Sequence, residues 1–430
     1  MITAKNKNIV YQFLFGLIIF LIPSNLFFKF IESSAYVNGL LIDYLIPKLY
    51  LSDLVIFTLF GWWLFDNKKI VFKNLKKVLK KITLWINKNK IISFLLLALI
   101  LRQFNTHSPI AAYWYLLKII EFGFLTFILM NKKKLISSTL IISSTIFTLF
   151  FQSILTILQF INQSSIFGYM FLGESDLNRQ IGLAKQTING IEKILPYGTT
   201  AHPNILGGII SLYLILLIGT LINPQLKKKK YHLQPFIVGP IIISLIALGL
   251  TFSLSAWTTF IIGIVLIFKK INTKKLLLLS LSLIILTPIL LQLGSLSSDK
   301  PSIKRRAYLN HAGINMLKSN PIWGVGLNNF TTQVEKYSPA REVVRFTQPS
   351  HHSLILILSE IGLLGLATTI LLVQKNKKLI KKNIKWGSIL LLIITPIIVL
   401  DHYFFTNQSG LLLIITTGVI TRNFLFPLRK

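Results

Sequence analysis

Long apolar runs alternate with short polar segments along almost the whole chain. A helix needs about 20 mostly apolar residues to cross the roughly 30 Å hydrocarbon core of a bilayer. The pattern therefore predicts an all-α, polytopic membrane protein with about 12 transmembrane helices. We predict these spans near residues 10–28, 48–65, 91–106, 111–130, 136–161, 203–222, 235–252, 254–268, 276–293, 353–373, 386–404 and 410–426.

Two polar segments between the predicted spans are long, and both are expected on the outer side of the membrane. Residues 162–202 follow the fifth span, and residues 294–352 form a large extracytoplasmic loop between the ninth and tenth spans. The chain would thus divide into the first nine spans with the shorter loop (1–293), the large loop, and the last three spans (353–430). Long ordered loops on a rigid scaffold commonly carry function, so we look for candidate chemistry near them.

Positive charge gathers in alternate connections between the spans. The chain has 46 Lys and Arg against 13 Asp and Glu, a formal net charge of +33. The lysines form blocks such as 68–90 and 375–385, which is typical of cytoplasmic loops, so we expect a multi-pass protein of the cytoplasmic (inner) membrane with both termini cytoplasmic. Membrane lipids are the expected partners of these blocks, and no nucleic acid is expected. Because only 14% of the residues are charged and none is cysteine, a soluble enzyme and a thiolate site are excluded.

The large loop contains one compact basic cluster, Lys304-Arg305-Arg306. It opens a predicted amphipathic helix over residues 304–319, which Asn320-Pro321 ends. Guanidinium groups bind phosphate oxygens through paired, charge-assisted hydrogen bonds. The cluster therefore predicts a phosphate site, with a patch for lipid headgroups as the alternative.

Two adjacent histidines, His351 and His352, stand directly before the tenth span. An imidazole at the membrane boundary can act as a general base near neutral pH, and an interfacial pair without a role is the alternative. At about 3.6 residues per turn, His351 and Gly362 are about three turns apart, which predicts a shared helical face. Glu360, in the same span, falls roughly opposite that face and would anchor the helix within the bundle.

Polar groups also stand at two other outward helix ends. His202 and Asn204 flank Pro203 at the start of the sixth span, where the helix dipole favours anions. Helix capping by Asn204 is the alternative. Asp401 and His402 follow the eleventh span and precede aromatic residues that either stack on a sugar or belong to the interfacial belt.

Together these stretches resemble the O-antigen ligase and O-antigen polymerase family of bacterial envelope glycan enzymes. Arg306 precedes Pro321-x-x-Gly324-x-Gly326 as the family's arginine does, and His351 precedes Glu360-Ile-Gly-Leu-Leu-Gly as its histidine does. Tyr197-Gly198 with His202-Pro203-Asn204 is similar to the segment before the family's sixth span. His352 stands where the family usually has Asn.

The resemblance implies transfer of a glycan from a polyprenyl-diphosphate carrier to an acceptor hydroxyl on the outer face of the membrane. His351 would remove the acceptor proton, and Arg306 would stabilise charge on the departing diphosphate. No metal or cofactor is then expected, and the acceptor is a lipid, a glycan or a protein. The residues expected to bind substrate are Arg305, His352, His202, Asn204, Lys193, Asp401 and His402.

Two positions depart from the family's pattern. Leu195 stands where the family often has arginine, and Ser253-Leu254-Ser255 stands where it has Ser-Arg-Ser. If both arginines normally hold the lipid diphosphate, Lys193 replaces one of them or the donor is held differently. The alternative is a weak enzyme or a non-catalytic family member.

Two further functions remain open. Glu174-Ser-Asp176 supplies an acidic pair of the kind that binds Mg²⁺ or Mn²⁺, as a metal-dependent glycosyltransferase would need. Twelve spans would also suit a flippase for lipid-linked oligosaccharides or a secondary transporter. Against a transporter stand the absence of an internal repeat and the few charges in the spans, where Lys118 and Glu121 are expected to neutralise each other.

Overall fold

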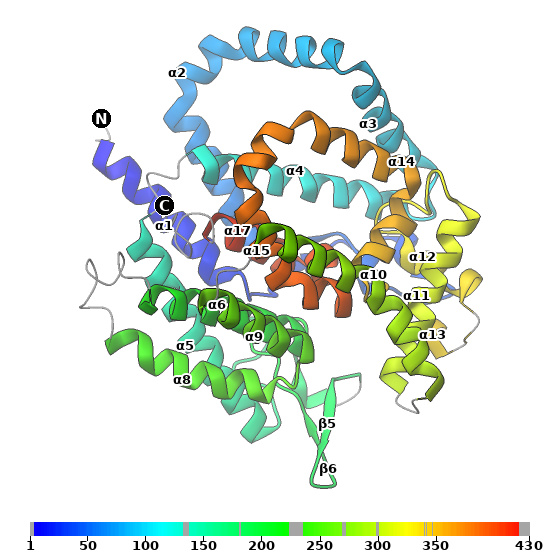
Figure 1. The fold of residues 1–430 in the computed structure, drawn as a ribbon. Helices are drawn as coiled ribbons and strands as arrows, with labels where there is room; N and C mark the ends of the chain where they lie inside the picture. Colours follow the sequence, from blue (N-terminus) through cyan, green and yellow to red (C-terminus); the bar gives the residue numbers. More distant parts are fainter. Residues whose placement is uncertain are drawn as a thin grey trace.

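The computed structural model of the chain describes residues 4–131, 137–179, 182–222, 235–268, 272–297, 301–338, 340, 342–345 and 347–420. Over these residues the fold is a mostly helical bundle with three small antiparallel sheets (Figure 1). Each predicted span overlaps one of its main helices. These are α1 (Ala4–Leu21), α2 (Leu51–Lys88), α3 (Lys90–Arg102), α4 (Pro109–Asn131), α5 (Ser138–Asn162), α6 (Pro203–Ile222), α8 (Pro235–Leu250), α9 (Leu254–Phe268), α10 (Thr273–Ser297), α14 (Ser353–Lys375), α15 (Lys377–Leu400) and α17 (Gln408–Ile420).

Apolar length divides these helices into two groups. Within the described ranges, α4, α5, α6, α10, α14 and α15 are long and apolar enough to cross a membrane, and the end of α2 with α3 would make a seventh, bent span. Apolar segments of α1, α8, α9 and α17 are shorter, and at about 1.5 Å per residue α9 spans only about 22 Å. The prediction of a helical membrane protein is confirmed, whereas the number of twelve spans stays a prediction.

The bundle is built around α6, whose side chains are apolar on every side and mostly buried. A helix of this kind needs neighbours all around it, and α6 packs against α5, α8, α9 and α17. Gly263 lets α9 approach closely, because a Cβ there would lie 2.3 Å from the Ile215 side chain of α6. The Tyr213 hydroxyl donates to Ile19 O at 3.1 Å, which ties α6 to α1.

The strands lie in connections between the helices. β1 and β4 bring the chain after α1 back to the point where α2 begins, with β2 and β3 between them. β5 and β6 form a hairpin that projects from the bundle (Figure 1). The strands are β1 (Phe27–Lys29), β2 (Tyr36–Val37), β3 (Leu40–Leu41), β4 (Lys48–Tyr50), β5 (Lys185–Ile188) and β6 (Ile191–Ile194).

The segment between α10 and α14 folds as a small helical unit. It contains α11 (Pro301–Ser319), α12 (Phe330–Tyr337) and α13 (Glu342–Arg345). The helix predicted over residues 304–319 is confirmed, because α11 ends directly before Asn320-Pro321. The unit has its own apolar cluster, which Leu356 of α14 joins, so the unit is anchored on that helix.

Two glycines let this unit pack tightly on α14. Gly324 and Gly326 both have positive φ, and a Cβ at Gly324 would lie 2.4 Å from Glu360 O. The backbone N–H groups of Val325 and Gly326 donate to the carbonyls of Ser359 and Glu360, both at 2.9 Å. The Gly-Val-Gly turn therefore serves to join the large loop to the helix that follows it.

Gly362 interrupts α14 with a φ of +63°. The prediction that His351 and Gly362 share one helical face is therefore wrong, because α14 begins only at Ser353 and is broken at Gly362. Glu360, expected to anchor the helix in the bundle, instead accepts from backbone N–H groups of the large loop, including that of Asn328 at 2.9 Å.

Candidate functional site

Three histidines from distant parts of the chain meet at one place. His202 precedes α6, His351 precedes α14 and His402 follows α15. The rings of His351 and His402 contact edge to face, with centroids 5.1 Å apart. The charge of Arg306, on α11, acts on all three imidazoles and on the carboxylate of Asp401, so these groups lie close together. We call these five residues the histidine cluster.

Asp401 ties together the helix ends around the cluster. Its carboxylate accepts from Asn204 Nδ2 at 2.9 Å and from Ser255 Oγ at 2.7 Å. Its backbone oxygen accepts from Ser353 Oγ at 3.0 Å. One buried residue thus connects the starts of α6, α9 and α14 to the end of α15, which fixes the frame that carries the histidines.

Asn310 links the arginine to the segment that carries His351. It lies one turn after Arg306 on the same face of α11, and its Oδ1 accepts from Ser350 Oγ at 2.7 Å. Ser350 immediately precedes His351. Nδ1 of His351 is buried and has no hydrogen-bond partner among the described residues. The ring is therefore positioned by its backbone and by contact with His402 rather than by a carboxylate on Nδ1.

A glutamine shapes the segment before α6. Gln159 Oε1 accepts from the backbone N–H groups of Tyr197 at 3.0 Å and Gly198 at 2.8 Å. Gly198 has a φ of +56°, which glycine adopts without strain. Nδ1 of His202 accepts from Asn204 N at 3.1 Å. His202 therefore caps α6. Asn204, which was considered as the cap from the sequence, donates its side-chain amide to Asp401 instead.

The imidazoles of the cluster are neutral at pH 7. Desolvation and the charges of His402 and Arg306 hold the pKa of His351 well below 6.5. Desolvation, with His202 and Arg306, lowers the pKa of His402 to about 3, and desolvation with Arg306 lowers the pKa of His202 to about 4. Burial raises the pKa of Asp401, against the opposing charge of Arg306. Each neutral imidazole keeps a nitrogen lone pair that can accept a proton or a hydrogen bond.

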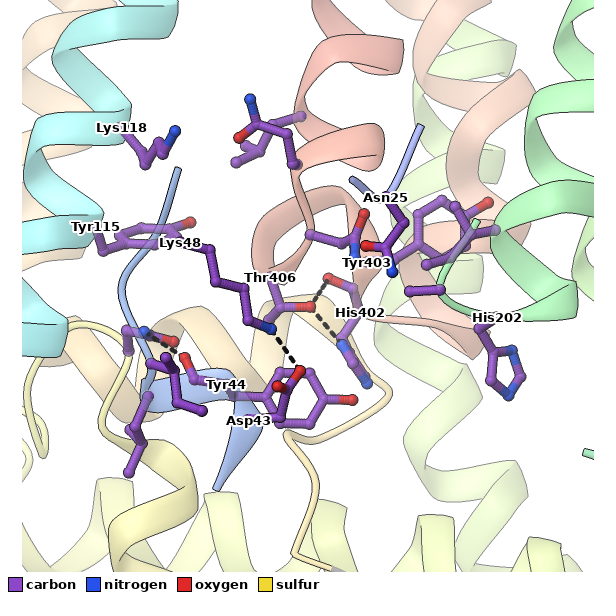
Figure 2. A pocket seen from close by; sticks show the side chains of 18 of the residues that line it. Asn25, Asp43, Tyr44, Lys48, Tyr115, Lys118, His202, His402, Tyr403 and Thr406 are labelled. Carbon is purple, nitrogen blue, oxygen red and sulfur yellow. Dashed lines mark hydrogen bonds and ion pairs between the residues drawn. The ribbon is translucent and has the colours of Figure 1, made fainter. Parts of the chain in front are cut away.

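A cavity of about 310 Å³ extends from the cluster towards α4. The three histidines and the aspartate line one end of it, and Lys48, Tyr115 and Lys118 line the other. Figure 2 shows these lysines and Tyr115 on one side and His402 on the other, with His402 Nδ1 held 2.6 Å from Thr406 Oγ1. The cavity therefore joins basic and aromatic side chains to the proton-accepting groups of the cluster.

The lysine end of the cavity is absent from the sequence prediction. Lys48 forms an ion pair with Asp43, which also pairs with Lys29 at 3.3 Å. The ammonium of Lys48 lies 4.8 Å from the centroid of the Phe27 ring. These residues come from β1, β4 and the segment between them, whose strands are too short to leave a periodic pattern in the sequence. The signal available in the sequence was the group of aromatic and charged residues from Phe27 to Lys48, around the segment between the first two predicted spans.

Lys118 is part of a buried charge group within the bundle. It pairs with Glu121 at 3.1 Å, so the predicted neutralisation is confirmed. It also pairs with Asp53, near the start of α2, which accepts from Gln408 as well. Only the first partner could be expected from the sequence, because α2 and α4 are brought together only by the fold.

Three predicted binding residues, His352, Lys193 and Arg305, do not line the cavity. The Nε2 of His352 lies 2.9 Å from Ile284 O, and its Nδ1 accepts from Ile355 N at 3.4 Å, so this buried ring caps α14. Lys193 lies on β6 in the projecting hairpin (Figure 1). Arg305 remains close to the cluster, because its charge is one of those that lower the pKa of His351.

The acidic pair considered as a metal site is used otherwise. Glu174 is fully buried, and its carboxylate accepts from the three consecutive backbone N–H groups of residues 166–168 at 2.6 to 2.7 Å. Asp176 pairs with Arg179 at 2.9 Å. Over the part of the chain that the structure describes, no three His, Asp or Glu residues are grouped to hold a metal ion.

The two leucines that stand where the resemblance leads us to expect arginine lie outside the histidine cluster. Leu195 is buried directly after β6, and Leu254 is 70% exposed at the start of α9. The flanking Ser255 is the residue of that segment which reaches Asp401. Positive charge around the cavity is supplied instead by Arg306 and by the lysines at the far end.

A family comparison covers the part of the chain that carries the catalytic candidates. Residues 239–370 match the model of a protein family described as O-antigen ligase. This region contains Ser255, Arg306 and His351. No curated protein and no solved structure matches the chain.

Proposed function

We propose that this chain, whose residues 239–370 belong to the O-antigen ligase family, transfers a glycan from a polyprenyl-diphosphate carrier to an acceptor hydroxyl. The reaction would take place at the histidine cluster, on the outer face of the cytoplasmic membrane. The observation that carries the proposal is the meeting of a neutral imidazole, His351, with an arginine, Arg306, beside one cavity. That pair supplies a proton acceptor and a cation for a leaving diphosphate.

The proposed step forms one glycosidic bond and breaks one bond to the diphosphate. The acceptor oxygen attacks the anomeric carbon while the C–O bond to the diphosphate breaks, and the diphosphate leaves with the bonding electron pair. His351 takes the proton of the acceptor hydroxyl, and its low pKa keeps it unprotonated and ready to do so. A positioned general base of this kind typically contributes about 10²–10⁴-fold to the rate.

Arg306 is available to bind the diphosphate. Its side chain has no hydrogen bond or ion pair with any residue that the structure describes, and it approaches the cluster from α11 without lining the cavity. A guanidinium can give two parallel hydrogen bonds to phosphate oxygens. Its charge would therefore be met by the donor, and it would stabilise the leaving group as negative charge develops there.

The far end of the cavity suits a sugar and a lipid chain. Trp114 and Tyr115 give the far end of the cavity aromatic faces on which the apolar side of a sugar ring can pack, and Tyr44 lies nearer the cluster, its ring centroid 5.6 Å from that of His402. A furrow of about 210 Å³ between α4 and α17 shares Tyr115 and Lys118 with the cavity and is otherwise lined mostly by apolar side chains. We place the polyprenyl chain in this furrow, where it would remain in contact with membrane lipid.

The pKa of His351 predicts the acid limb of the pH profile. Base catalysis needs the neutral imidazole, and a folded-state pKa well below 6.5 keeps the ring neutral as the pH falls through 6.5. The kcat/KM for transfer is therefore expected to stay level from about pH 7 down through 6.5 and to decline only below it. Initial rates measured across this range test the expectation, and a half-maximal rate at pH 6.5 or above would contradict it.

Reconstitution separates glycan transfer from lipid flipping. The purified full-length chain would be placed in liposomes with a lipid-linked glycan and an acceptor, and the products would be separated by chromatography. We expect glycosylated acceptor and free polyprenyl diphosphate in equal amounts. Movement of the donor across the bilayer without either product would favour the flippase and overturn the proposal.

A further inference from the structure

The end of α2 is an amphipathic helix with one apolar and one basic face. At about 100° per residue, five of its six apolar side chains fall within a sector of about 120°, and its lysines fall on the opposite side together with Leu84. The apolar residues of this face are Val78, Leu79, Ile82, Trp85 and Ile86. The lysines are Lys76, Lys77, Lys80, Lys81 and Lys88. We call residues 76–88 the basic helix.

The apolar face of the basic helix has no partner among the described residues. Its side chains are 40% to 55% exposed, and Leu79 and Ile82 are the most exposed of them. Every described residue from 76 to 88 is exposed, so the lysine face is equally open. A contiguous exposed apolar surface of this kind is typical of a surface that contacts a membrane or another protein.

The direction of the basic helix relative to its neighbour favours a membrane. The axis of Lys76–Lys88 makes an angle of 99° with that of Lys90–Asn105 across the break at Asn89. The far end of the second segment reaches the large loop, where Leu327 N donates to Gln103 Oε1 at 2.9 Å. If that segment crosses the bilayer, the basic helix runs parallel to the membrane plane, and Figure 1 shows the end of α2 passing over one end of the bundle.

The length of the crossing segment supports the same placement. Its 16 residues, from Lys90 to Asn105, extend about 24 Å, which is less than the roughly 30 Å hydrocarbon core. An interfacial helix lies with its apolar face about 5–10 Å below the headgroups. A crossing segment that starts from such a helix therefore has less than the full thickness of the hydrocarbon core to cross. Lysines on the other face then point to the headgroup region.

We propose that the basic helix is an interfacial anchor on the membrane face opposite the histidine cluster. Its apolar side chains lie in the boundary between headgroups and acyl chains, and its lysines bind the headgroups of anionic phospholipids. The charge of the lysine face is complementary to such lipids, and a row of apolar side chains opposite it matches the acyl boundary. The inference does not depend on the proposed transfer reaction.

Spin labels can test the orientation of this helix, because the chain contains no cysteine and each label would be unique. Single cysteines at each position from 76 to 88 would be labelled in the full-length chain in lipid nanodiscs. We expect oxygen accessibility to peak at positions 78, 82 and 86, and accessibility to a water-soluble nickel complex to peak at 77, 81 and 88. Nickel accessibility at every position would indicate a solvated arm, and a single oxygen maximum at the middle residue would indicate a re-entrant segment. Either result would overturn the proposal.

Lipid composition tests the role of the lysines. For a label at position 82, we expect oxygen accessibility to rise about twofold when about a third of the phosphatidylcholine is replaced by phosphatidylglycerol. The variant K76Q/K77Q/K80Q/K81Q is expected to lose this response and keep the alternation of faces. The matched control K377Q/K378Q/K381Q/K382Q removes four exposed lysines from α15 and is expected to keep the response. Equal accessibility in both lipid mixtures for the wild-type lysines would contradict binding to anionic headgroups.

Discussion

Replacing His351 with alanine is expected to lower the rate of glycan transfer by about 10²–10⁴-fold, because the proposed general base is removed. His402, the neighbouring ring, has its Nδ1 held 2.6 Å from Thr406 Oγ1, whereas Nδ1 of His351 has no hydrogen-bond partner among the described residues. The folded protein should persist, since the buried Nδ1 of His351 has no hydrogen-bond partner among the described residues that the change would leave unpaired. The measurement is the initial rate of product formation in proteoliposomes, normalised to folded protein.

The adjacent histidine provides the matched control for this variant. His352 caps α14. The family that the chain resembles usually has asparagine at this position, and asparagine is itself a good helix cap. His352→Asn is therefore expected to retain transfer within about twofold of wild type. If His351→Ala transfers glycan at the wild-type rate, or if both variants lose activity equally, His351 is not the base.

Hydropathy was sufficient to locate the helices but not to count the spans. Each predicted span overlaps a helix because an apolar stretch in a bilayer must satisfy its backbone hydrogen bonds internally. The count depends on where each helix lies relative to the bilayer. The prediction for residues 48–65 ended where lysines begin, whereas α2 continues through the lysines to Lys88 and then turns sharply at Asn89. Hydropathy alone does not show whether a helix continues past the point where lysines begin.

The polar motifs predicted the site as a group, although each motif taken alone was a weak indication. His202, His351, Asp401 and His402 were each weak signals, and the fold unites them because each stands next to the end of a helix and these ends meet. His352 could not be distinguished from its neighbour by sequence. The carbonyl that engages its ring belongs to Ile284 of α10, far away in the chain.

The aromatic and lysine end of the cavity was missed for a related reason. Lys48 enters the cavity because β4 pairs with β1, and Trp114 and Tyr115 enter because α4 packs nearby. In the sequence these aromatic residues are indistinguishable from an interfacial belt, which is their commoner role. Only the packing of α4 beside this small sheet shows which of them face a cavity.

Arg306→Ala is expected to reduce transfer by about 10²–10³-fold, because the departing diphosphate would lose a preorganised cation. Arg306→Lys keeps the charge but loses the planar pair of donors, so an intermediate loss is expected. The same assay measures both variants. A control is available on the same helix, since Lys318→Ala removes an exposed positive charge from the last turn of α11 and should leave the rate unchanged.

The pH profile separates electrostatic action of Arg306 from a structural effect. Its charge is one of the causes that lower the pKa of His351, after desolvation and the charge of His402. Removing a nearby cation makes the protonated imidazole less unfavourable, so the pKa should rise and the acid limb should move to higher pH in Arg306→Ala. Disturbance of α11 packing alone would lower the rate at every pH without moving the limb. An unmoved limb, with a rate close to wild type, would exclude Arg306 from both the electrostatics and the chemistry of the site.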